Sequence, residues 1–481
     1  MLAAIDRVQQ INPQVNAVIA LDPTALDQAR AIDRRGAISA PLGRMPVLIK
    51  DNIETAGPLA TTGGSLALTT NVTARDAPLV ARLRAAGGVI LGKTNLSEWA
   101  NIRSDASISG WSAVGGQTRN PHALSRSPCG SSSGSGAAVG AGMVTAAIGT
   151  ETDGSITCPA AINGIVGLKP TVGLVSRTHV IPISHSQDAP GPMAGDVRTA
   201  AMLLSAIAGS DSADPATVEA DAHKADYAAG LRADSLKGAR LGVLRWATGW
   251  HAGVDARFEA ALAVLKAQGA VLIDITEAPD QHQIGENETK VLMTELKADL
   301  NAYLATTPPA VLPRTLADVI AFNQAHAGEE LALFGQGSFV TAEQTKGLDD
   351  PAYRKSLATS RQLAGPGGLD RMLTASKVDA LVAPTAPPAW FIDPVNADQA
   401  PFGGAGSLAA VAGYPHLTVP MGGVLGLPVG LSFIGPKWSE AQLLSFGYAF
   451  EQAAPEMKLS PAFLKAIEDQ PAVRKMLLPA R

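Results

Sequence analysis

The sequence predicts an α/β protein. Short apolar runs typical of strands alternate with helix-like segments along the whole chain of 481 residues. The composition agrees, because 46% of the residues are hydrophobic and only 17% are charged, as in a large protein with a deep interior. A chain of this length often has two or three domains, although large α/β enzymes can also form one body.

The first part of the chain supplies the clearest αβ unit. Residues 1–35 have a helix-like pattern that breaks at Pro13 and resumes after Pro23. Residues 76–92 then follow the order of an Asp cap, a helix, a glycine stop and a strand. Such a unit can add its strand to a parallel sheet.

Residues 127–171 contain two serine-and-glycine loops on either side of the apolar run VTAAIGT. Glycines let the backbone come close to a bound carbonyl, and consecutive N–H groups in such a turn can converge on one oxyanion. The two serine loops therefore suggest nucleophilic chemistry. A flexible linker is the alternative interpretation, but linkers rarely enclose an apolar run long enough for a buried strand.

The rest of the chain passes through a mainly helical section and then returns to strands. We expect a surface excursion over residues 211–236 and helices across residues 286–363. The remaining expected elements are strands at 239–245 and 378–384, a helix at 256–268, a hairpin formed by 416–423 and 427–435, and a final helix capped by Ser439.

Charge and cysteine content exclude several classes of protein. The formal net charge is −5 without a long basic run, so we expect no nucleic-acid partner. The most apolar long segment, residues 137–148, is too short to span a bilayer. The N-terminus does not resemble a secretory signal, although a trimmed leader stays open. The two cysteines, Cys129 and Cys158, form no disulfide framework, so we expect free thiols and a cytoplasmic location. A single bridge between these two cysteines is the alternative.

Lys50 stands directly after the three apolar residues Val47, Leu48 and Ile49, which have the pattern of a short buried strand. Most lysines at the end of a strand turn to solvent. The alternative is a buried lysine whose pKa is lowered until the amine can act as a neutral base.

Two familiar motifs match as strings but not in context. GGVILGKT, residues 87–94, satisfies the P-loop pattern, yet its supposed loop is apolar and resembles a strand. GSSSG, residues 130–134, satisfies G-x-S-x-G with Ser132 at its centre, but a polar, proline-broken loop precedes it instead of a strand. Ser132 stays the main alternative nucleophile. No metal-binding motif is present, so we expect no metal site.

Three separated motifs together resemble those of the amidase signature family. PCGSSSGS resembles the glycine-serine signature of the family, GTETDGSI its nucleophile loop, and LIKDNI the strand end that carries its lysine. The resemblance is dense from Pro41 to Ala194 and resumes more thinly after Val378. It implies an α/β fold in which helices wrap a large mixed β-sheet.

The resemblance also implies the organisation of the chain into a single domain over residues 1–481. The signature core would occupy about residues 40–200, and the chain would return to this core at about 378–455. A variable helical section at about 286–363 would shape the pocket.

Position by position, the resemblance implies a Ser-Ser-Lys triad. Ser155 is then the nucleophile, Ser131 the bridging serine held on a cis peptide, and Lys50 the base. A buried, neutral Lys50 can accept the proton of Ser131, which accepts that of Ser155 as Ser155 attacks an amide carbonyl. The implied oxyanion donors are the backbone N–H groups of Thr152, Asp153, Gly154 and Ser155.

The chain departs from the commoner family pattern at Glu151, Asp153 and Thr157. Asp153 puts a side chain beside the nucleophile and Thr157 removes a cation, which weakens the case for substrates with a free carboxylate. Trp111 lies in a glycine-rich loop, where an exposed aromatic residue favours binding. The candidate substrate-binding residues are Trp111, Cys129, Gly130 and Asp153.

The motifs are most similar to those of bacterial peptide amidases, which release ammonia from the C-terminal amides of peptides. We therefore expect a monomeric or homodimeric amidase that acts on small amides or short peptide amides without a metal or organic cofactor. One alternative is an aryl-amide, nylon-oligomer or carbamate hydrolase with the same triad. A more remote alternative is a partner-dependent amidotransferase subunit.

Overall fold

The computed structural model describes residues 1–34, 40–400 and 403–477 of the chain. In chain order the strands are β1 (Val18–Leu21), β2 (Pro46–Lys50), β3 (Val89–Thr94), β4 (Trp111–Ser112), β5 (Gly116–Gln117), β6 (Ala146–Glu151), β7 (Val166–Lys169), β8 (Ala189–Ala194), β9 (Arg240–Leu244), β10 (Val271–Ile275), β11 (Ala380–Pro384), β12 (His416–Val424) and β13 (Leu427–Ile434).

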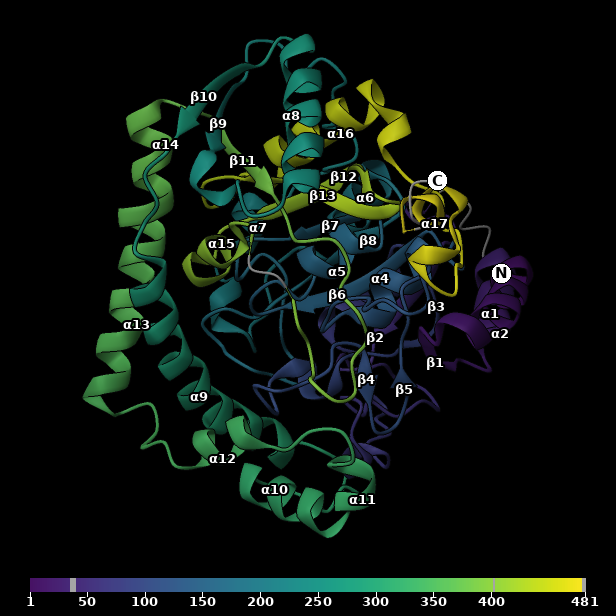
Figure 1. Cartoon of the computed structure of the whole chain (residues 1–481). Helices are drawn as coiled ribbons and strands as arrows, with labels where there is room; N and C mark the ends of the chain where they lie inside the picture. Colours follow the sequence, from purple (N-terminus) through teal and green to yellow (C-terminus); the bar gives the residue numbers. More distant parts are fainter. Residues whose placement is uncertain (35–39, 401–402, 478–481) are drawn as a thin grey trace.

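The α-helices surround these strands (Figure 1). They are α1 (Leu2–Val15), α2 (Ala25–Arg34), α3 (Pro78–Ala85), α4 (Ser133–Gly140), α5 (Thr157–Ile162), α6 (Val197–Ile207), α7 (Ala220–His223), α8 (Ala252–Ala267), α9 (Gln281–Ala305), α10 (Leu316–Ala325), α11 (Ala327–Glu330), α12 (Gly337–Glu343), α13 (Pro351–Ala364), α14 (Arg371–Ser376), α15 (Gly406–Ala412), α16 (Glu440–Ala453) and α17 (Pro471–Leu477).

Eleven of the strands form one mixed sheet in the order β1-β3-β2-β6-β8-β7-β12-β13-β11-β9-β10, while β4 and β5 form a small separate pair. β2 pairs in parallel with β3 and β6, whereas β6 pairs antiparallel with β8. β12 and β13 form the expected antiparallel hairpin. The predicted α/β fold with a large mixed sheet wrapped by helices is confirmed.

The central strands are buried on both faces, which explains their continuous apolar runs. Alternate residues of a strand point to opposite faces. On β2, Val47 and Ile49 belong to the core under α3 and α6, whereas Leu48 belongs to the core that contains α1 and α4. Lys50 ends this strand and is itself fully buried, so it comes directly out of the middle of the sheet.

The N-terminal region differs from expectation in three details. α1 continues through Pro13 and ends at Val15, because the missing N–H of a proline in the last turn removes only one bond. β1, which was not predicted, pairs antiparallel with β3. Asp76 does not cap α3 but accepts hydrogen bonds from Ala56 N and Arg84 Nε. Residue 35, the end of the expected helical pattern, lies outside the described residues.

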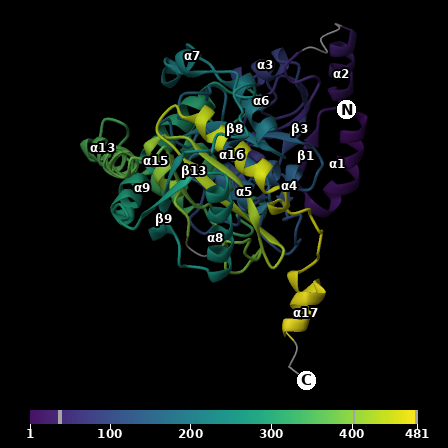
Figure 2. The same cartoon turned by 90° about the horizontal axis from the view of Figure 1, so that it is seen from above.

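The helical section between β10 and β11 comprises α9 to α14, and its helical character was predicted. α13 lies alongside α9, and both views show the pair at one side of the sheet (Figures 1 and 2). α17, near the C-terminus, projects away from the main body in Figure 2. In the described ranges, no helix is both long and apolar enough to cross a membrane.

Candidate active site

The buried end of β2 brings Lys50 against the first serine loop. Its Nζ lies 2.7 Å from Ser131 Oγ, 2.9 Å from Thr150 Oγ1 and 3.2 Å from Thr150 O. Lys50 has no exposed surface and Ser131 is 1% exposed. Of the two interpretations that the sequence left open for this lysine, the buried one is therefore correct.

Burial controls the charge of Lys50. Loss of water around the ammonium group lowers the pKa of Lys50 from 10.5 to about 7, although the negative charges of Asp188 and Glu151 oppose the change. A neutral amine has a free lone pair. Near neutral pH, Lys50 can thus accept the Ser131 proton while it still donates to Thr150.

The loop that carries Ser131 is closely packed. A cis peptide bond joins Gly130 to Ser131, and Ser97 N donates to Ser131 O at 3.1 Å. A Cβ added at Gly130 would lie 2.1 Å from Ser97 Oγ, so a larger residue does not fit at this position. Gly130, a candidate substrate-binding residue, therefore has a clear packing role.

Ser132 is held by the backbone of the neighbouring strand. Its Oγ donates to Thr150 O at 3.1 Å and accepts from Thr150 N at 3.2 Å. The side chain is fully buried, and no strand leads into it within the described residues before α4. The geometry thus gives Ser132 a structural role and lacks the strand that a nucleophile elbow requires.

Ser155 lies in the turn between β6 and α5. It is 8% exposed, and its carbonyl accepts from Ser132 N at 3.1 Å, which brings the two serine loops together. In the part of the chain that the structure describes, Ser155 Oγ makes no hydrogen bond. Catalytic hydrogen bonds often tighten only when substrate binds, so the missing bond does not exclude Ser155 as a nucleophile.

Glu151 explains the shape of this turn. Its Oε2 accepts from Ile156 N at 2.7 Å and from Thr157 N at 2.8 Å. The carboxylate therefore occupies the N-terminal end of α5, where the helix dipole favours negative charge. Glu151 was noticed in the sequence only as a departure from the family pattern, and its capping role becomes visible only in the structure.

Asp188 supports the same turn from the segment that leads into β8. Thr152 Oγ1 donates to Asp188 at 2.6 Å, and the backbone N–H groups of Ile183 and Ser184 donate to it at 2.8 and 2.9 Å. Burial raises the pKa of Asp188 to about 6. Asp188 thus positions Thr152 and also favours the protonated form of Lys50.

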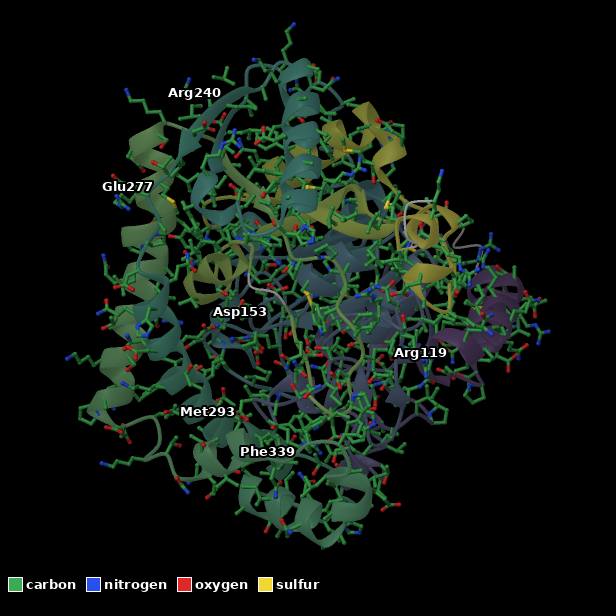
Figure 3. The ribbon with its side chains drawn as sticks, in the orientation of Figure 1. Arg119, Asp153, Arg240, Glu277, Met293 and Phe339 are labelled. Carbon is green, nitrogen blue, oxygen red and sulfur yellow. A yellow bond between two sulfur atoms is a disulfide. The ribbon has the colours of Figure 1, made fainter. Side chains whose placement is uncertain are left out.

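A further acidic residue, Glu288 of α9, lies near the turn and was not found from the sequence. Gln187 Nε2 donates to Glu288 at 2.8 Å and to Thr152 O at 3.2 Å, so it joins the two. Burial raises the pKa of Glu288 to about 8 and that of Asp153 to about 6. Asp153 lies near the middle of the molecule (Figure 3). Glu288 lies in a helical stretch that contains no recognisable motif, so the sequence alone did not indicate that it approaches the site.

Trp111 does not stand exposed as expected from its loop. Its ring meets Phe334 edge to face at 5.2 Å, and the Arg103 guanidinium lies 5.6 Å from its centre. Phe334 comes from the helical section, so only the long-range fold reveals this contact. The expected exposure of Trp111 is therefore wrong, and its assignment to substrate binding stays a prediction.

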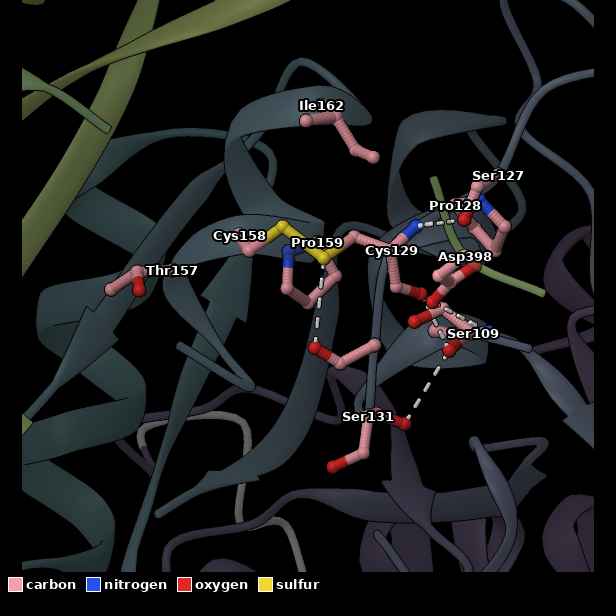
Figure 4. Close-up of a disulfide and its surroundings, with 12 residues drawn as sticks. Ser109, Ser127, Pro128, Cys129, Ser131, Thr157, Cys158, Pro159, Ile162 and Asp398 are labelled. Carbon is pink, nitrogen blue, oxygen red and sulfur yellow. Dashed lines mark hydrogen bonds between the residues drawn. A yellow bond between two sulfur atoms is a disulfide. The ribbon is translucent and has the colours of Figure 1, made fainter. Parts of the chain in front are cut away.

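The expectation of free cysteines is also wrong. Cys129 and Cys158 form a disulfide whose Cα atoms are 6.1 Å apart (Figure 4). The two residues are 29 positions apart in the sequence, and this spacing alone gives no sign that they meet. They meet because β6 and the Ser132 contacts fold the two serine loops against each other.

One group of side chains has the spacing of metal ligands. His185, Glu295 and Asp299 offer atoms within 4.8 Å of one another. Glu295 already accepts hydrogen bonds from Ser186 Oγ at 2.5 Å and from Tyr353 OH at 2.7 Å. His185 Nδ1 lies 2.9 Å from Asp299 Oδ2. These contacts give the cluster a structural role that joins α9 to the segment before β8.

The family model described as Amidase matches residues 1–444. The crystal structure of the native peptide amidase from Stenotrophomonas maltophilia is similar, with a TM-score of 0.90 and 51% identity over 96% of this chain and 94% of that chain. An Arabidopsis thaliana protein described as a probable amidase is 39% identical over 93% of this chain and 85% of that protein. A glutamyl-tRNA(Gln) amidotransferase chain of Symbiobacterium thermophilum is 34% identical over 96% of this chain and 94% of that protein.

Proposed function

The chain belongs to the amidase family and is an amide-hydrolysing enzyme; from this premise we propose that it removes the C-terminal amide of short peptides, with Ser155 as nucleophile. Ser131 is the bridge and Lys50 the base. The observation that carries this proposal is the 2.7 Å contact between Lys50 Nζ and Ser131 Oγ beside the Ser155 turn.

The proton path follows from this contact. Neutral Lys50 takes the proton of Ser131, and Ser131 takes that of Ser155 as Ser155 Oγ bonds to the amide carbon. The reverse transfers protonate the departing nitrogen, which leaves as ammonia. Water then attacks the acyl-enzyme by the same path and releases the peptide acid.

Backbone donors near Ser155 support an oxyanion hole. Within the described part of the chain, the N–H groups of residues 152–155 donate to no protein acceptor, although they surround the proposed nucleophile. Such unpaired donors can stabilise the negative oxygen that forms in the transition state. We assign this role to the N–H groups of Thr152, Asp153, Gly154 and Ser155.

The choice of peptide amides rests on the similarity to peptide amidase. A related crystal structure, 51% identical to this chain, holds peptide amidase with the competitive inhibitor chymostatin. A glutamine substrate, as the amidotransferase relatives suggest, carries a free carboxylate. Asp153, with a pKa of about 6, is mostly ionised at neutral pH and would repel that carboxylate, so this residue favours substrates without one.

The test compares ammonia release from a blocked dipeptide amide with hydrolysis of an aryl anilide and a carbamate. Ser155→Ala should lose at least about 10³-fold in kcat, because a missing nucleophile removes the covalent route. Ser132→Ala is the matched control for the alternative nucleophile and should keep measurable turnover. Faster hydrolysis of the anilide than of the peptide amide would contradict the proposed substrate class. A Ser155→Ala variant that stays active would contradict the assignment of Ser155 as the nucleophile.

We also propose that the enzyme works in an oxidising compartment rather than in the cytoplasm expected from the sequence. The Cys129–Cys158 disulfide supports this, because reducing compartments keep such pairs as thiols. Rapid thiol alkylation in intact cells tests it. Alkylated cysteines would contradict the proposal, and protected cysteines would support it.

A further inference from the structure

We propose that the Cys129–Cys158 disulfide is a positioning element of the amide-hydrolysing reaction, which holds the Ser131 loop in register with the Ser155 turn. The proposal rests on the proposed function of these serines. Cys129 lies two residues before Ser131, and Cys158 lies three residues after Ser155. Figure 4 shows Ser131 on the chain that leads directly from Cys129.

On the first loop, Cys129 is fixed on both sides. Its N–H donates to Ser127 Oγ at 3.1 Å, and its carbonyl accepts from Ser133 Oγ at 2.7 Å. Only Gly130 separates Cys129 from Ser131, and Ser97 leaves no space around that glycine. A displacement of Cys129 would therefore pass directly to Ser131, whose Oγ must stay within reach of Lys50.

On the second loop, Cys158 belongs to the first turn of α5. Its N–H donates to Gly154 O at 2.9 Å, so it is bonded to the residue that precedes Ser155. Gly154 and Ser155 belong to the turn before α5, which carries the unpaired N–H groups proposed as the oxyanion hole. The position of Cys158 thus affects both the nucleophile and the donors that would stabilise the developing negative oxygen.

Hydrogen bonds also join the two loops, but they constrain the loops less than a covalent bond does. Ser132 N donates to Ser155 O at 3.1 Å, and Ser132 Oγ donates to Thr150 O at 3.1 Å. These bonds and the surrounding core should preserve the fold after the disulfide opens. A small loss of register is nevertheless enough to slow catalysis, since a misplacement of about 1 Å can cost about 100-fold in rate.

A dithiol reductant opens the bond in two exchange steps. One thiolate of the reductant attacks a sulfur of the disulfide, the other cysteine leaves as a thiolate, and the second thiol of the reductant then releases the first cysteine. Two electrons pass to the protein, both cysteines end as thiols, and the reductant becomes a disulfide. The chain has only two cysteines, both in this bond, so the reductant acts on no other disulfide of the chain.

The experiment compares the oxidised enzyme, the enzyme reduced with dithiothreitol, and the C129S/C158S variant. Ammonia release gives kcat and KM, and a fluorophosphonate probe gives the rate of covalent labelling of Ser155. Reduction should lower kcat and labelling by about 10-fold or more and change KM less than kcat, because it displaces the reacting groups Ser131 and Ser155. Reoxidation should restore both, and dithiothreitol should not change the variant.

Several results would overturn the proposal. Detection of two free thiols in the oxidised enzyme would contradict the proposal. So would a reduction that leaves kcat and labelling within about twofold of the oxidised values. Loss of the far-UV circular dichroism signal in parallel with activity would show that the bond only supports the fold. Full activity of the C129S/C158S variant would overturn it as well.

Failure of the proposed function has a different signature. Labelling that persists in Ser155→Ala would refute the nucleophile. If the oxidised enzyme released ammonia from no amide tested, while Ser155 labelling still fell on reduction and recovered on reoxidation, the substrate proposal would fail. The positioning role of the disulfide would then stand.

Discussion

At the scale of single residues, the surroundings of a side chain determine its chemistry. Lys50 has the ordinary side chain of a lysine, but the end of β2 places it where water cannot reach its ammonium group. Desolvation therefore lowers the pKa of Lys50 to about 7, with partial compensation by Asp188 and Glu151. The apolar residues before Lys50 indicated this possibility, whereas the contacts with Ser131 and Thr150 required the fold.

The pH dependence of the free enzyme tests this charge state. The active form holds neutral Lys50, so kcat/KM should fall as pH drops below about 7 and approach a loss of about tenfold per pH unit. Above the pKa of Lys50, kcat/KM should level off. A profile that stays flat from about pH 8 to about pH 5, measured with a blocked dipeptide amide, would show that no base of lowered pKa takes part.

At the scale of elements, the neighbouring strand and helix determine the conformation of the two serine loops. β6 ends at Glu151, whose carboxylate caps α5, and the turn between them presents Ser155. The sequence motifs predicted the roles of Ser131 and Ser155 and the strand between them. It could not predict the disulfide, because that bond depends on how closely the loops approach in space.

The disulfide should also contribute to stability. It closes a loop of 29 residues, and restricting such a loop in the unfolded chain is worth about 3–4 kcal/mol. Reduction should therefore lower the free energy of unfolding by about that amount. Urea unfolding with and without reductant measures the change, with C129S/C158S as the variant that reductant should not affect. An unchanged unfolding midpoint of the unsubstituted chain would contradict this prediction.

At the scale of the whole molecule, buried polar contacts join the helical section to the sheet region. Arg103 Nη1 donates to Glu98 Oε1 at 2.5 Å and lies 3.5 Å from Glu330 Oε2 on α11. Glu330 also accepts from Leu66 N at 2.6 Å. Arg103 and Glu330 are 227 positions apart, so no local pattern could reveal this contact, although the helices themselves were predicted from periodicity.

Substitution of Glu330 tests this connection. Glu330→Ala would leave the buried Arg103 without one of its two carboxylates and Leu66 N without its acceptor, so it should cost about 3–5 kcal/mol of unfolding free energy. The neighbouring Glu329 is exposed, and Glu329→Ala should change stability by less than about 0.5 kcal/mol. Urea unfolding of both variants decides the matter, and equal stabilities would contradict the prediction.

The most direct measurement is the capture of an acyl-enzyme. The purified chain is mixed with a blocked dipeptide amide, quenched in acid within one turnover, digested and mapped by mass spectrometry. We expect the peptidyl group on Ser155, and its absence when Ser155 is replaced by Ala. A peptidyl group on Ser132 or on another residue, or ammonia release without any covalent intermediate, would contradict the proposed Ser-Ser-Lys mechanism.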